Sequence, residues 1–91
     1  MAKIDFEQME IFTSVRRATS LRRDVREGFA DMVYTNVNGI AAHALALKIY
    51  GSRGATEYDE DEVRLIRMVA ERLCVPGFID GLEKQINEKS E

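Results

Sequence analysis

The sequence predicts an all-α protein: a compact bundle of four or five short helices with an apolar third helix at its centre. Three observations support this fold class. Apolar residues recur at helical spacing over nearly the whole chain. The 91 residues include one proline and six glycines, which suits helices joined by short turns. Two segments also carry residues typical of helix starts. We expect one domain spanning residues 1–91.

The first helix is expected to begin at Asp5, which can cap it while Gln8 returns a hydrogen bond. An apolar stripe then recurs every three residues: Phe6, Met9, Phe12 and Val15. Thr19–Ser20 is either a break with a new N-cap or a polar pair inside one long helix, and we favour the break. The second helix then runs from Leu21 to about Thr35.

The third helix, Ile40–Tyr50, is apolar almost all round. Its residues Leu45, Leu47 and Ile49 alternate as in a strand, but its four alanines favour helix. A helix without a polar face is surrounded by other helices or covered by a second subunit. We therefore expect this helix at the centre of the bundle, with the ammonium of Lys48 reaching solvent, and we expect a homodimer.

The fourth helix has the clearest start, because Asp59 can cap it, Glu62 occupies its third position, and acidic residues 59–62 complement the helix dipole. It ends at Val75–Pro76. Pro76 begins the last helix, which runs to about Glu88. Gly77 and Gly81 lie four residues apart in that helix and permit the close approach of another helix.

The composition indicates a soluble, cytoplasmic protein. The net charge of -3 and the pI of about 5.2 give no overall attraction to nucleic acid or to an anionic membrane. A single cysteine, Cys74, excludes an intramolecular disulfide and favours a reducing compartment. Residues 1–8 lack the apolar segment of a secretory signal, and Ile40–Tyr50 is shorter than the roughly 20 residues that span a bilayer. We therefore expect no membrane partner.

No catalytic, cofactor-binding or metal-binding arrangement can be assembled from the sequence. His43 is the single histidine and Cys74 the single cysteine, so a zinc ligand set is missing. We interpret Cys74 as a small buried hydrophobe rather than a nucleophile. Consecutive carboxylates at residues 59–62 do not match the spaced ligands of a calcium-binding loop. The sequence therefore predicts a protein that is not an enzyme and has no cofactor.

The favoured function is a small protein-interaction module, an adaptor or small subunit that self-associates. The apolar third helix is the reason, since it offers more apolar surface than a chain of this length easily covers. The expected interaction surface combines residues of the third and fourth helices: His43, Leu47, Tyr50, Leu65 and Met68.

The alternative function is a nucleic-acid-binding accessory protein that uses the arginine cluster Arg16–Arg26. In it, Arg22, Arg23 and Arg26 would contact phosphates. On a helical wheel these three lie on one flank of the second helix, while an acidic flank lies on the other side of its stripe. This arrangement is typical of charge pairing between packed helices, so the sequence disfavours nucleic acid as a partner.

Overall fold

The computed structural model describes residues 2–88, and it corrects the fold class from all-α to α+β. In chain order the elements are β1 (Ala2–Ile4), β2 (Met9–Phe12), β3 (Ser20–Arg23), α1 (Arg26–Asn36), α2 (Ile40–Tyr50), β4 (Thr56–Tyr58), α3 (Glu60–Leu73) and α4 (Pro76–Glu88). The strands form two separate antiparallel pairs, β1 with β4 and β2 with β3. The expected single domain covers residues 1–91, of which residues 1 and 89–91 lie outside the described part.

The prediction of a helix beginning at Asp5 is wrong, because this segment forms a turn between two strands. The Asp5 carboxylate accepts hydrogen bonds from the N–H groups of Glu7 (2.9 Å) and Gln8 (3.0 Å), as a capping residue would. The same local chemistry serves turns and helix starts. The spacing of the expected apolar stripe was coincidental: Met9 is buried on β2, whereas Val15 is fully exposed in the loop that follows.

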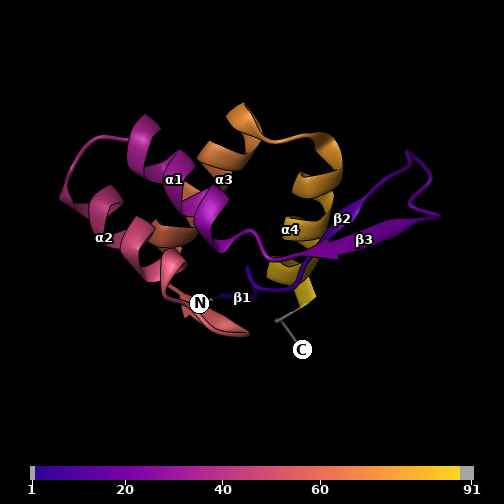
Figure 1. Cartoon of the computed structure of the whole chain (residues 1–91), viewed down its shortest axis with the longest axis horizontal. Coiled ribbons are helices and arrows are strands. Elements are labelled where there is room, and N and C mark those ends of the chain that lie inside the picture. Colours follow the sequence, from indigo (N-terminus) through magenta and orange to yellow (C-terminus); the bar gives the residue numbers. More distant parts are fainter. Residues whose placement is uncertain (1, 89–91) are drawn as a thin grey trace.

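The predicted second helix begins too early, because residues 20–23 form β3. This strand pairs with β2 in a hairpin in which Ile11 lies opposite Leu21. The Thr13 N–H donates to the Thr19 carbonyl at 2.9 Å, and Arg17 adopts the left-handed conformation (φ 58°) within the loop. Figure 1 shows this hairpin projecting from the body of the protein, at the end away from α2. The helix itself starts at Arg26.

The predicted helices of the C-terminal half are present in the structure. Helix α2 has the expected bounds, and α4 begins at Pro76. At the start of α3, the Asp59 carboxylate accepts from the Glu62 N–H (2.8 Å), while the Glu62 carboxylate accepts from the Asp59 N–H (2.9 Å). This reciprocal capping box is the one expected from the sequence.

The close approach expected at Gly77 and Gly81 is present, but the neighbour is a strand rather than a helix. A Cβ atom on Gly77 would lie 1.9 Å from the carbonyl oxygen of Phe12, and one on Gly81 would lie 1.8 Å from that of Glu10. Helix α4 therefore lies directly against the backbone of β2, and only glycine fits at these two contacts.

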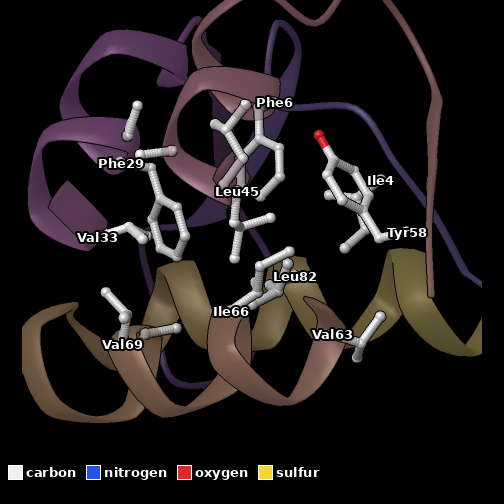
Figure 2. Packing of buried hydrophobic residues seen from close by; sticks show 14 of the residues in the cluster. Ile4, Phe6, Phe29, Val33, Leu45, Tyr58, Val63, Ile66, Val69 and Leu82 are labelled. Atoms are coloured by element: carbon white, nitrogen blue, oxygen red, sulfur yellow. The ribbon is translucent and has the colours of Figure 1, made fainter. Parts of the chain in front are cut away.

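The hydrophobic core lies between the α1–α2 pair and the α3–α4 pair, as Figure 2 shows for the labelled side chains. A row of rings crosses it: Phe29 stacks on Phe6 (centroids 5.1 Å apart) and on Phe78 (5.7 Å). Tyr58 meets Phe6 edge-on at 5.8 Å. Turn, strand and helix residues thus share one core, and the sheets contribute through Ile4, Met9 and Tyr58.

The expectation that the third helix is central is also wrong. Helix α2 lies at one end of the molecule (Figure 1) and buries one face, formed by Ala42, Leu45, Ala46 and Ile49. Its other face is exposed.

The Tyr58 side chain is completely buried. Burial raises the pKa of Tyr58 to about 12, and the Glu62 carboxylate adds to the increase. The Ser52 hydroxyl donates to the Ile49 carbonyl (2.7 Å), and within residues 2–88 the buried Tyr58 phenol oxygen has no hydrogen bond. The ring also carries the Lys48 ammonium over its face, 4.6 Å from the centroid.

Tyr58→Phe is expected to make the protein less sensitive to alkaline pH. The native pKa of Tyr58 lies above the ordinary value of 10, so native protein keeps a proton that unfolded protein loses. This contribution to stability is complete below pH 10 and is lost as the pH rises through about 12. Urea denaturation between about pH 8 and pH 12 should show a steeper loss of unfolding free energy in the wild type than in Tyr58→Phe. If the unfolding free energies of the wild type and Tyr58→Phe fell equally with pH, the raised pKa of Tyr58 would be contradicted.

Candidate interaction surface

The exposed face of α2 forms an apolar surface that extends onto α1. Ile40, Leu47 and Tyr50 are 88%, 59% and 58% exposed, at the spacing of one helix face. Tyr34 of α1, 60% exposed, reaches the same surface, because its ring lies 5.7 Å from that of His43. We call this surface the α2 patch; it consists of Tyr34, Ile40, His43, Ala44, Leu47 and Tyr50.

The α2 patch contains no aspartate, glutamate, lysine or arginine. The one charged residue of α2, Lys48, instead donates to the Glu62 carboxylate of α3 at 2.9 Å and lies over the Tyr58 ring. Its ammonium is therefore held against α3 rather than extended freely into solvent. An uncharged surface with two tyrosines and large aliphatic residues is typical of the centre of a protein interface.

The residues expected to form one interaction surface lie in three places. His43, Leu47 and Tyr50 share the α2 patch. Leu65 is partly buried and packs against the core. Met68 lines a groove between α3 and α4. The two residues of α3 therefore do not extend the α2 patch.

The groove beside Met68 has a volume of about 980 Å³ and is lined by several arginines. Two of these are committed to carboxylates. Arg67 makes two hydrogen bonds to Glu83, at 2.8 and 2.9 Å, and Arg64 pairs with Asp61 at 3.0 Å. The pair with Glu83 raises the pKa of Arg67. The Arg67–Glu83 pair joins α3 to α4, whereas the Arg64–Asp61 pair lies within α3, so these two arginines of the groove have structural partners.

The arginines considered for phosphate binding are not on one helix flank. Arg22 and Arg23 lie on β3, where successive side chains point to opposite faces. Arg26 begins α1 and pairs with Asp24 at 2.8 Å, and it also donates to the Ser52 carbonyl at 2.9 Å. The pair with Arg26 lowers the pKa of Asp24. Arg26 thus belongs to a structural network, while Arg22 and Arg23 are exposed.

Neither a reactive thiol nor a metal-binding group of side chains is found among the described residues. Cys74 is partly buried at the end of α3, and burial raises the pKa of its thiol, which disfavours the reactive thiolate. Between residues 2 and 88, no group of three or more histidine, cysteine, aspartate or glutamate side chains is placed to hold a metal ion. In the same range, no helix has both the length and the apolar character needed to cross a membrane.

Comparison with protein-family models, with curated proteins and with solved structures yields no match.

Sequence reasoning missed three members of the α2 patch, Tyr34, Ile40 and Ala44. Ile40 could have been found, because Ile40, Ala44 and Leu47 follow one another at the i, i+4 and i+7 spacing of a docking helix face. Tyr34 gives no such signal. It joins the patch only because α1 and α2 pack side by side, which places its ring beside His43.

Proposed function

We propose that this protein is a non-enzymatic protein-interaction module that self-associates through the α2 patch. The observation that carries the proposal is the exposed, uncharged and apolar outer face of α2. Single exposed apolar residues are ordinary on protein surfaces, but a continuous group of them marks a contact site.

A second copy of the chain fits this patch well. A two-fold interface brings the same surface together twice, and a patch without charged residues can meet itself without repulsion. Ala44 is exposed near the middle of α2 and allows two antiparallel helices to approach closely. In that arrangement Ile40 of one copy lies near Leu47 and Tyr50 of the other.

The dimer is expected to be weak. Helix α2 has 11 residues, so it is about 16 Å long. Its outer face is therefore smaller than the roughly 800 Å² that each partner contributes to a standard interface. A dissociation constant on the order of 100 µM fits an interface of this size.

Leu47→Glu is expected to abolish self-association while leaving the fold intact. Leu47 is 59% exposed, so the monomer tolerates the change, whereas a symmetric dimer would have to bury two new carboxylates. Light scattering after size exclusion, at loadings from about 10 µM to 1 mM, should show the wild-type mass rising from 10.4 kDa toward twice that value. Leu47→Glu should stay at the monomer mass.

The matched control is Val15→Glu, which adds the same charge at a fully exposed residue of the hairpin loop. It should self-associate like the wild type. A wild-type mass of 10.4 kDa at every loading would contradict the proposal, as would equal effects of the two substitutions.

A further inference from the structure

Strand β3 presents an unpaired backbone edge. The hydrogen bond from the Thr13 N–H to the Thr19 carbonyl fixes the alternation of the hairpin, so Leu21 and Arg23 bond to β2 while the backbone groups of Ser20 and Arg22 point away from it. Within residues 2–88, no other strand pairs with β3. All four residues of the strand are exposed.

The opposite edge of the same hairpin is closed. There Gly77 and Gly81 of α4 lie against the carbonyl oxygens of Phe12 and Glu10. A further strand can therefore join this sheet only at β3. Edge strands are sites where an extended segment of another protein can add by main-chain hydrogen bonds.

The hairpin is also the positive part of an acidic protein. Residues 9–23 contain four arginines and one glutamate, whereas the whole chain has a net charge of -3. Arg17 pairs with Asp80 at 3.3 Å. Among the described residues, Arg16, Arg22 and Arg23 have no ion pair; Arg22 has a 3.5 Å contact to the Gln8 carbonyl. Arg22 and Arg23 on the free edge and Arg16 in the hairpin loop therefore have no direct ion pair, although Arg22 lies opposite Glu10 of β2.

The charges indicate which partner fits. Two copies of β3 pairing edge to edge would place their Arg22 side chains as neighbours on one face with no carboxylate in either strand to pair with them, and neighbouring like charges destabilise a sheet. Nucleic acid fits less well, because Arg22 and Arg23 point to opposite faces. The one aromatic ring of the hairpin, Phe12, is covered by the cationic groups of Arg17 and Lys84, so no open ring is left for a base to stack on.

We propose that the free edge of β3 is a docking site for an extended acidic segment of a partner protein, which adds to the hairpin as a third strand. Carboxylates opposite Arg22 and Arg23 form cross-strand pairs, and an apolar residue lies next to Leu21. For an antiparallel partner this corresponds to the order Glu-Glu-Val-Thr. The site goes beyond self-association and lies away from the α2 patch (Figure 1).

The test uses a capped peptide with Glu-Glu-Val-Thr at its centre, titrated into the isotopically labelled protein and followed by NMR. Binding should shift the amide signals of Ser20 and Arg22 and slow their hydrogen exchange by about tenfold or more. The amides of Leu21 and Arg23 already face β2 and should change less. Absence of binding up to about 1 mM peptide, or shifts centred on another element, would overturn the proposal.

Two matched peptides separate strand addition from simple charge attraction. N-methylation of the second Glu and of Thr removes the donors that face β3 and should abolish binding. N-methylation of the first Glu and of Val removes donors that face solvent and should leave binding unchanged. Equal binding by the two methylated peptides would overturn the proposal. A ten-nucleotide thymidine strand that binds more tightly than the peptide would also overturn it and would favour nucleic acid instead.

Charge reversal on the protein completes the test. The double variant Arg22→Glu/Arg23→Glu should weaken peptide binding by about tenfold or more. Its control, Arg53→Glu/Arg72→Glu, changes the net charge equally at two exposed arginines outside the hairpin and should retain most of the affinity. Equal losses in the two double variants would contradict docking at β3.

Discussion

Gly81→Ala is expected to lower the free energy of unfolding by about 3 kcal/mol or more. Inside a helix this substitution is normally favourable by about 1 kcal/mol. Here the new Cβ would lie 1.8 Å from the Glu10 carbonyl oxygen, a backbone atom that cannot rotate away. Helix α4 and strand β2 would have to separate. Urea denaturation followed by circular dichroism measures the effect.

The matched control for this prediction is Gly28→Ala in α1. A Cβ on Gly28 would meet no atom within 4 Å, and the residue lies inside the helix. This change is expected to stabilise the protein by about 1 kcal/mol, because alanine restricts the unfolded chain and favours helix. If Gly81→Ala left the free energy of unfolding unchanged or increased it, as Gly28→Ala is expected to do, the close contact between α4 and β2 would be contradicted.

Phe29→Ala is expected to cost about 3–5 kcal/mol of unfolding free energy. The Phe29 ring is completely buried and stacks between Phe6 and Phe78, so its removal leaves a cavity bordered by a turn residue and by α4. In a protein of this size such a loss is a large share of the total stability.

Tyr34→Ala, on the same helix, provides the comparison for Phe29→Ala. Tyr34 is 60% exposed, so at dilute, monomeric concentration its replacement should change the unfolding free energy by about 0.5 kcal/mol or less. If the two variants lost similar stability, the row of rings would not be the centre of the core.

The sequence predicted the C-terminal half well because its signals are local. The capping box of Asp59 and Glu62, the alanines of α2 and the position of Pro76 each act within a few residues. The first 23 residues have no comparable signal. Strand β1 pairs with β4, more than fifty residues away, and β2 is held by the glycines of α4. Such partners override a short run with helical spacing.

The candidate surface was predicted in part for the same reason. His43, Leu47 and Tyr50 were placed together because the face of a single helix follows from its periodicity. The positions of Leu65 and Met68 relative to these three residues depend on how α3 packs against the other helices, which the periodicity of a single helix does not show. The sequence pattern places the arginine cluster on a helix, but residues 20–23 form an edge strand, which puts Arg22 and Arg23 on opposite faces.

The pairing of β1 with β4 has a consequence for synthesis of the chain on the ribosome. The Asp5 N–H donates a hydrogen bond to the side-chain oxygen of Gln85 on α4 (2.7 Å), and the Phe6 ring packs against Phe29 of α1 and Tyr58 of β4. The N-terminal segment therefore cannot complete its contacts until the last helix has left the exit tunnel. Until then the nascent chain carries an exposed aromatic segment next to an open strand edge, the kind of segment that chaperones bind.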